Sequence, residues 1–99
     1  MANYILTNKA VDDLSNIWDY TCEVWSESQA DKYYNMLIDC FEKLARGKAV
    51  GKNYDEISDE IFGLRAGKHI IFYRTLKGSK IEVARILHER MDLKSRMQE

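Results

Sequence analysis

A chain of 99 residues of which 45% are hydrophobic is long enough for one domain with one modest core. It leaves no room for a separate cofactor domain. We expect no membrane span, because the sequence has no apolar run of about 18 residues. We expect no signal peptide, because the first residues lack a basic region followed by a long apolar stretch. Cys22 and Cys40 fall at apolar helix positions without a CxxC pair. We therefore expect buried free thiols, no metal, no cofactor and a cytoplasmic location.

The net charge of −1 hides an asymmetry between the two parts of the chain. Residues 1–63 hold six Lys/Arg and twelve Asp/Glu, which gives −6. Residues 64–99 hold nine Lys/Arg and four Asp/Glu, which gives +5. Either the C-terminal part offers a basic surface to an acidic partner, or the two parts neutralise each other in the fold.

The first half of the sequence predicts a short strand and then two helices. The strand is Tyr4-Ile-Leu, and Thr7 is a candidate N-cap of the first helix. Ser26 to Gln29 matches a capping box for the second helix, which Gly47 would end. The short connection predicts an antiparallel helical hairpin. The aromatic residues at helical spacing are expected in the core, with one of them, near the helix end, also available as an interface anchor: Trp18, Trp25, Tyr33, Tyr34 and Phe41.

The second half predicts a loop and then three strands. Residues 47–60 break any sustained period, apart from one helical turn at 54–57. Strands are expected at about 62–66, 69–76 and 80–87, joined by hairpin-sized turns. The order strand, helix, helix and three strands predicts one α+β domain over residues 1–99. Its helical hairpin packs on one face of a mostly antiparallel sheet, and a polar tail or short helix follows.

The central strand, residues 69–76, is apolar on both of its faces, at Ile70, Ile71, Phe72 and Tyr73. Such a strand needs cover on both sides. The helical hairpin supplies one cover only. The second must come from the C-terminal tail, from self-association or from a partner.

A cationic run crosses the end of the last strand at Arg85, His88 and Arg90. An arginine that interrupts an apolar alternation needs a partner, because an unpaired charge in a packed sheet is costly. Arg85 either pairs with Asp92 or a helix carboxylate, with His69 capping a hairpin, or it belongs to a working surface. Hairpin-linked strands could bring the cationic residues of this region together: Arg65, Lys68, His69, Arg74, Arg85, His88 and Arg90.

Three sequence motifs together resemble the ParE toxins of the RelE/ParE group. They are D-L-x-x-I-W-D-Y at 13–20, G-K-H-I-I-F-Y-R at 67–74 and R-I-L-H-x-R-M-D at 85–92. Their order covers the chain from Tyr4 to Asp92. The resemblance implies the same α+β fold and a toxin of a type II toxin–antitoxin module. Such a toxin inhibits DNA gyrase by binding, and a ParD-like antitoxin neutralises it with a segment that folds over the hairpin and sheet. A homodimer and a toxin–antitoxin heterotetramer both stay open.

This interpretation assigns two sets of binding residues. The expected target-binding residues lie in the cationic C-terminal region: Arg85, His88, Arg90, Met91, Lys94 and Arg96. The expected antitoxin-binding residues are Trp25, Arg65, Phe72 and Arg74. Direct nucleic-acid binding is not expected, because only Phe72 and Tyr73 are aromatic among the strand cations.

Two alternatives remain open beside a gyrase-binding toxin. The first is a RelE-type, ribosome-dependent endoribonuclease, in which histidines transfer protons and arginines stabilise charge on phosphate. Its catalytic residues would be His69, Arg74, Arg85 and His88. The second is an inert member of the fold that only binds a partner.

Overall fold

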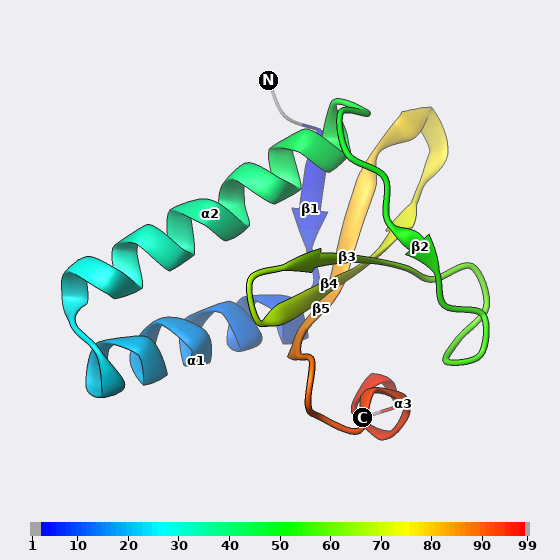
Figure 1. Cartoon of the computed structure of the whole chain (residues 1–99). Helices are drawn as coiled ribbons and strands as arrows, with labels where there is room; N and C mark the ends of the chain where they lie inside the picture. Colours follow the sequence, from blue (N-terminus) through cyan, green and yellow to red (C-terminus); the bar gives the residue numbers. More distant parts are fainter. Residues whose placement is uncertain (1–2, 99) are drawn as a thin grey trace.

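The computed structural model describes residues 3–98 and places a helical hairpin against a five-stranded sheet (Figure 1). The elements are β1 (Tyr4–Leu6), α1 (Asn8–Val24), α2 (Glu27–Ala45), β2 (Lys52–Asn53), β3 (Phe62–Ala66), β4 (His69–Thr75), a 3₁₀ turn (Lys77–Ser79), β5 (Ile81–His88) and α3 (Leu93–Met97). The predicted α+β order is confirmed, and the polar tail contains a short helix. Sequence periodicity missed β2, which is too short to show an alternating pattern.

The strand order in the sheet is β1-β5-β4-β3-β2. β1 pairs with β5 in parallel, and the other neighbours are antiparallel. The two helices form the crossover from β1 back to the sheet. Gly67 and Lys68 join β3 to β4, and the φ of +60° at Gly67 is a conformation that glycine adopts without strain.

Side-chain caps begin both long helices where the sequence predicts them. Thr7 Oγ1 accepts the Ala10 N–H at 3.1 Å and donates to the Ala84 carbonyl at 2.7 Å. One residue thus caps α1 and ties its start to β5. Ser26 Oγ accepts the Gln29 N–H at 3.1 Å. Gly47 follows the end of α2 with a φ of +71°, in agreement with the predicted stop.

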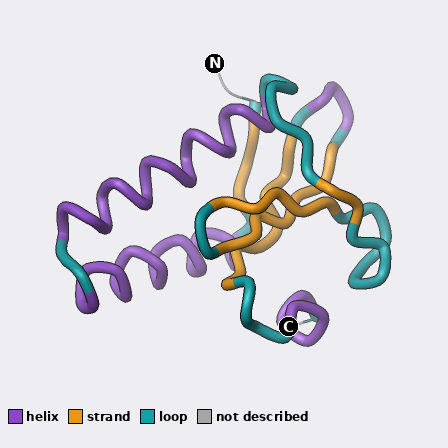
Figure 2. The backbone as a smooth tube through the Cα atoms, viewed as in Figure 1, coloured by secondary structure: helices purple, strands orange, loops and turns teal. Residues whose placement is uncertain are grey.

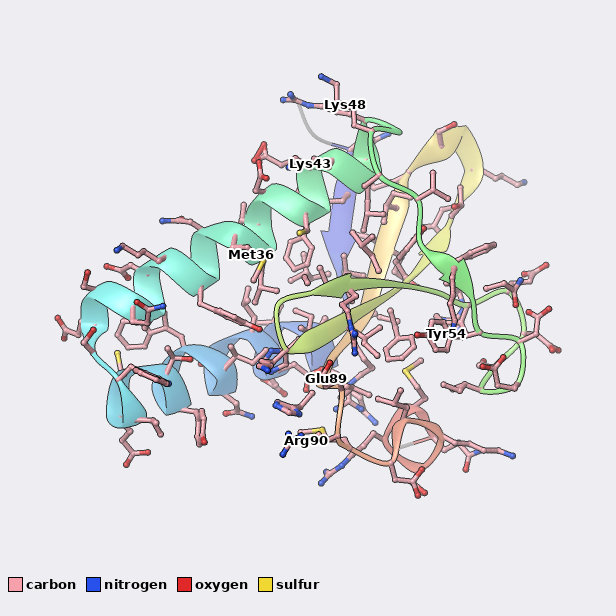
Figure 3. The ribbon with its side chains drawn as sticks, in the orientation of Figure 1. Met36, Lys43, Lys48, Tyr54, Glu89 and Arg90 are labelled. Carbon is pink, nitrogen blue, oxygen red and sulfur yellow. The ribbon has the colours of Figure 1, made fainter. Side chains whose placement is uncertain are left out.

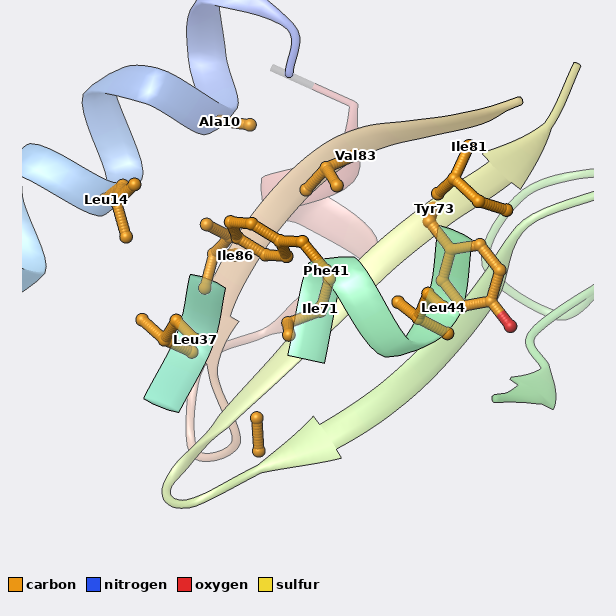
Figure 4. Packing of buried hydrophobic residues seen from close by; sticks show 11 residues of the cluster. Ala10, Leu14, Leu37, Phe41, Leu44, Ile71, Tyr73, Ile81, Val83 and Ile86 are labelled. Carbon is orange, nitrogen blue, oxygen red and sulfur yellow. The ribbon is translucent and has the colours of Figure 1, made fainter. Parts of the chain in front are cut away.

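The main core lies between the hairpin and the sheet, with Phe41 of α2 at its centre (Figure 4). Phe41 and Leu37 are fully buried against the strands. A β-bulge changes the alternation of β5, because Phe72 is opposite Arg85 whereas Tyr73 is opposite Val83. On β5, Val83 and Ile86 therefore both face the main core although they are three residues apart.

Three of the five aromatic residues expected in the core are absent from it: Trp18, Trp25 and Tyr34. Trp25 is 73% exposed and Tyr34 is 39% exposed, so the core prediction is wrong for both. The tip of the hairpin extends beyond the sheet (Figure 1), and Trp25 lies at the end of α1 in that tip. Trp18 is partly buried, and its Nε1–H donates to Asp31 at 3.2 Å across the hairpin.

A second, smaller core covers the other face of the sheet. Its buried residues are Ile61, Ile70, Phe72, Ala84 and Leu87. Residues of the 54–57 turn and of α3 pack over them: Tyr54, Ile57, Leu93 and Met97. Figure 2 shows α3 as a separate short helix joined to the end of β5 by an irregular segment.

The chain therefore supplies the second cover itself, and the tail contributes part of it as one alternative predicted. This finding corrects the assignment of Phe72 to antitoxin binding, since its side chain is fully buried. Gly63 makes room for the cover, because a Cβ there would lie 2.6 Å from the Tyr54 ring.

Candidate functional site

A cleft of about 530 Å³ lies between α1 and the segment that follows β5. A second hollow of about 340 Å³ shares four of its lining residues, Tyr20, Thr21, His69 and His88, and extends to the hairpin tip. We call the two together the histidine cleft. It is lined by Asp13, Asn16, Ile17, Tyr20, Thr21, Trp25, Gln29, Tyr33, Lys68, His69, Arg85, Ile86, Leu87, His88, Arg90, Met91 and Arg96.

Two histidines occupy the middle of the cleft. His69 begins β4 and His88 ends β5, and the antiparallel register places them directly opposite each other. Their rings meet edge to face with centroids 5.3 Å apart. Burial, with a further contribution from His88, lowers the pKa of His69 to about 4, so His69 is neutral near pH 7. His88 Nδ1 accepts the Arg90 N–H at 3.1 Å, so a neutral His88 ring has its proton on Nε2.

Tyr33 of α2 holds the β3–β4 turn and His69 together. Its hydroxyl accepts the Lys68 N–H at 2.9 Å and lies 2.7 Å from His69 Nδ1. Burial raises the pKa of Tyr33. The sequence prediction that His69 caps this hairpin is thus wrong in its detail, because the capping group is Tyr33.

Arg85 forms an ion pair with Asp13 of α1 that is nearly closed to solvent. Arg85 Nε and Nη2 donate to the two Asp13 oxygens at 2.8 and 3.0 Å, and the Ile86 N–H donates to Oδ2 at 3.0 Å. The two side chains are 11% and 13% exposed. Arg85 Nη1 also donates to the Arg96 carbonyl at 2.7 Å. The same side chain therefore fastens both α1 and α3 to β5.

This geometry confirms one prediction for Arg85 and corrects two others. Its partner is a helix carboxylate, as one alternative stated, and not Asp92. Asp92 instead caps α3 by accepting from Ser95 N–H at 3.3 Å and Ser95 Oγ–H at 3.0 Å, which lowers the pKa of Asp92. With its guanidinium occupied inside the fold, Arg85 is a structural residue, and we remove it from the expected target-binding set.

The four residues of the nuclease alternative do not assemble. His69, Arg85 and His88 line the cleft, but Arg74 lies five residues along β4 from His69, roughly 16 Å away. Arg74 is on the opposite face of the sheet, 3.9 Å from Glu82. The arginine nearest the histidines is tied to Asp13, and His69 is held by Tyr33.

The other expected binding residues separate into two groups. Arg90, Met91 and Arg96 line the cleft together with Trp25, whereas Lys94 lies on α3 outside this lining. Arg65 is mostly exposed on β3 and forms an ion pair with Glu89. Figure 3 shows Glu89 and Arg90 in the segment between β5 and α3.

Sequence analysis assigned no site role to Tyr20, Thr21 or Tyr33, although all three line the cleft, whereas Lys68 belonged to the predicted cationic set and also lines it. The helical spacing of α1 could have predicted that Tyr20 and Thr21 lie on the same face as Asp13. Asp13, Ile17, Tyr20 and Thr21 recur three or four positions apart and so share one helix face. Knowing that Asp13 meets β5 would have placed that whole face beside the histidines.

None of the helices within residues 3–98 is long and apolar enough to cross a membrane. Within the same residues, no group of three or more His, Cys, Asp or Glu is placed to hold a metal ion. Cys22 and Cys40 are free thiols, and each is half-buried.

Known proteins resemble this chain over almost its whole length. Residues 4–93 match the family described as ParE toxin of type II toxin-antitoxin system, parDE. Toxin ParE1 of Mycobacterium tuberculosis is 36% identical over 92 residues, covering 93% of this chain and 94% of that protein. Toxin ParE of Escherichia coli is 35% identical over 97 residues, covering 98% and 94%.

A solved structure described as the chromosomal ParDE TA system from P. aeruginosa has the same fold, with a TM-score of 0.74 and 21% identity. The match covers 89% of this chain and 96% of that one. From its sequence and its architecture, this chain belongs to the ParE toxin family of type II toxin–antitoxin systems.

Proposed function

We propose that this protein is a toxin that inhibits DNA gyrase by binding to it and that a ParD-like antitoxin neutralises it. The observation that supports binding over turnover is the state of the histidine cleft. Arg90 is exposed beside the open cleft, but two of the residues that would transfer protons or stabilise phosphate are engaged. His69 is held by Tyr33, and Arg85 is held by Asp13.

The target-binding surface in this proposal is the open end of the cleft. It comprises His88, Arg90, Met91 and Arg96, of which Arg90 and Met91 follow β5 in an exposed, irregular segment. Exposed arginine and methionine side chains are enriched in protein interfaces. Gyrase is inferred as the target from the family resemblance.

Support for the antitoxin comes from the family and from the solved structure described as a ParDE system. Of the residues expected to contact it, Trp25 is exposed at the hairpin tip, and Arg65 is mostly exposed at β3. Arg74 is partly exposed next to Glu82. These three residues remain proposed antitoxin contacts, whereas Phe72 does not, because its side chain is buried.

A supercoiling assay tests the proposal directly. The purified chain is added to DNA gyrase and relaxed plasmid, with and without the protein encoded beside its gene. We expect the chain to inhibit supercoiling and the second protein to restore it. Unaffected gyrase together with cut messenger RNA in expressing cells would instead favour the endoribonuclease alternative. A stable complex without toxicity on expression would favour the inert alternative.

A further inference from the structure

Three consecutive backbone N–H groups after the end of β5 have acceptors within the chain. The Glu89 N–H donates to the Lys68 carbonyl at 2.9 Å, and the Met91 N–H donates to the His88 carbonyl at 3.0 Å. Between them, the Arg90 N–H donates to His88 Nδ1 at 3.1 Å. These residues belong to neither β5 nor α3, yet hydrogen bonds within the chain define their course.

The hydrogen bonds at His88 have the form of an Asx turn. In such a turn a side chain accepts the N–H of the residue two positions later, and the acceptor is usually an asparagine or aspartate oxygen. The chain has an ordinary example at Asn53, whose Oδ1 accepts the Asp55 N–H at 2.7 Å. At His88 an imidazole nitrogen takes the place of that oxygen. One residue thus closes the turn twice, through its carbonyl and through its ring.

A series of contacts supports the His88 ring from the rest of the fold. The ring meets that of His69 edge to face, with centroids 5.3 Å apart, and His69 Nδ1 lies 2.7 Å from the Tyr33 hydroxyl. The same hydroxyl accepts the Lys68 N–H. The turn at His88 is therefore supported by β4 and α2, two elements of the main core.

The side chains that this turn presents belong to the proposed target-binding surface. Arg90 is exposed, and Met91 is 41% exposed. A partner that binds a disordered segment must also order its backbone, which costs conformational entropy. A backbone that is already ordered in the free protein avoids that cost, so the partner binds more tightly. The hydrogen bond to His88 Nδ1 therefore bears on the affinity of Arg90 and Met91 for the target.

The two ring nitrogens of His88 allow two different roles in binding. Because Nδ1 accepts from the Arg90 N–H, a neutral ring carries its proton on Nε2 and can donate only from there. A target contact would use Nε2–H, whereas a support of the turn uses Nδ1. The ring is only partly exposed, and its Nδ1 is the nitrogen that holds the backbone, which favours the second role.

We propose that His88 is a positioning residue, which through Nδ1 holds the turn that presents Arg90 and Met91 to the target. This inference rests on the proposed function and changes the part of His88 in it from a contact to a support. It also makes Nδ1 unsuitable as a general base, because a proton accepted there would displace the Arg90 N–H.

Two substitutions distinguish the two nitrogens. The amide of His88→Asn places an oxygen near the position of Nδ1, where it can accept the Arg90 N–H as Asn53 accepts that of Asp55. The longer amide of His88→Gln reaches the position of Nε2 and lacks an acceptor at that of Nδ1. In the gyrase supercoiling assay, His88→Gln should need about fivefold more toxin for half-maximal inhibition, the typical contribution of one hydrogen bond, whereas His88→Asn should need at most about twofold more. Stronger inhibition by His88→Gln than by His88→Asn would overturn the proposal.

Amide hydrogen exchange measured by NMR reports on the turn without gyrase. The Arg90 N–H should exchange about fivefold faster in His88→Gln than in the wild-type chain and near the wild-type rate in His88→Asn. The Glu89 N–H, which the Lys68 carbonyl accepts, is the internal reference. Asn53→Gln is the matched control, because it opens the same kind of turn at β2 and should change neither the Arg90 exchange rate nor the inhibition. An unchanged Arg90 exchange rate in His88→Gln would contradict the assigned hydrogen bond.

A double-mutant cycle tests whether His88 acts through the residue that it positions. Arg90→Gln removes the presented charge and should itself weaken inhibition. If His88 acts by presenting Arg90, then His88→Gln should weaken inhibition clearly less in the Arg90→Gln background than in the wild-type chain. Full additivity of the two effects would mean that His88 contacts the target independently, and the proposal would be wrong.

Failure of the proposed function would have a different signature. If the wild-type chain does not inhibit gyrase, the proposed function fails and target presentation fails with it, while the Arg90 exchange rates still decide whether His88 holds the turn. If the wild-type chain inhibits gyrase and His88→Gln inhibits it equally well, only the present inference is overturned. Circular dichroism should show that all variants are folded.

Discussion

The two faces of the sheet are closed in different ways. The helical hairpin covers one face with long helices that bury Leu37, Phe41 and Leu44. The other face is closed by the turn around Tyr54 and by the five-residue helix α3, whose residues are at most partly buried. The hairpin side is therefore the scaffold of the domain, whereas the opposite side is a thin cover over an apolar strand.

The largest effect is expected at the centre of the scaffold. Phe41→Ala removes a fully buried ring from the main core and should lower the free energy of unfolding by roughly 3–5 kcal/mol. Urea denaturation followed by circular dichroism measures it. Tyr34→Ala, on the exposed side of the same helix, is the control and should cost less than about 1 kcal/mol. Equal losses in the two variants would contradict the assignment of the scaffold.

Breaking the ion pair between α1 and β5 should cause the second largest loss in the free energy of unfolding. Asp13→Asn leaves the Arg85 guanidinium without its carboxylate in a site that is largely closed to solvent. We expect a loss of about 3 kcal/mol in the free energy of unfolding, measured by urea denaturation. Asp12→Asn, exposed one position earlier, should change stability by less than about 0.5 kcal/mol. Because Arg85 also holds the Arg96 carbonyl, α3 should exchange its amide hydrogens faster in Asp13→Asn.

A substitution in the thin cover should lower the free energy of unfolding less than one in the main core. Leu93→Ala removes a partly buried contact between α3 and the second core, with an expected loss of about 1–2 kcal/mol. Fluorescence of a hydrophobic dye should rise, because Phe72 and Leu87 lose part of their cover. Lys94→Ala, on the same helix and exposed, should show neither change. A loss as large as that of Phe41→Ala would mean that the two faces are equally important for stability.

Acid should weaken the fold through His69, which joins the hairpin to the end of the sheet. Its pKa is about 4 in the folded chain and near 6.5 when unfolded, so the unfolded state binds the proton more readily. The stability that the neutral His69 ring contributes is therefore fully present above about pH 6.5 and is lost as the pH falls towards 4. For a half-buried ring we expect a loss on the order of 1 kcal/mol. Thermal melts from pH 7 to 4 should show a smaller decrease in His69→Gln.

Much of the architecture was predictable because it depends on local chemistry. Thr7 and Ser26 cap helices through hydrogen bonds to N–H groups three residues later, and Gly47 and Gly67 adopt positive φ angles. Such features need no knowledge of distant residues. Hydrophobic periodicity did not predict the features that depart from a regular repeat, which are the two-residue strand β2 and the bulge in β5.

The site was only partly predictable, because its members meet through tertiary contacts. His88, Arg90, Met91 and Arg96 were recognised as one cationic stretch. The sequence could not show that Tyr20 and Trp25 of α1 lie along the same groove. It also could not assign the arginines, since Arg85 and Arg90 look alike in a sequence. One is closed inside an ion pair and the other is exposed beside the cleft.

By itself, the sequence determined the order of the two long helices and of the strands other than β2, the caps of those helices and a C-terminal part rich in positive charge. These follow from side-chain spacing and from hydrogen bonds between residues a few positions apart. Only the tertiary structure decided which cations are neutralised, that the chain closes its second sheet face with its own residues, and where an open groove remains. Those outcomes depend on contacts such as Asp13 with Arg85, 72 positions apart, which local patterns cannot specify.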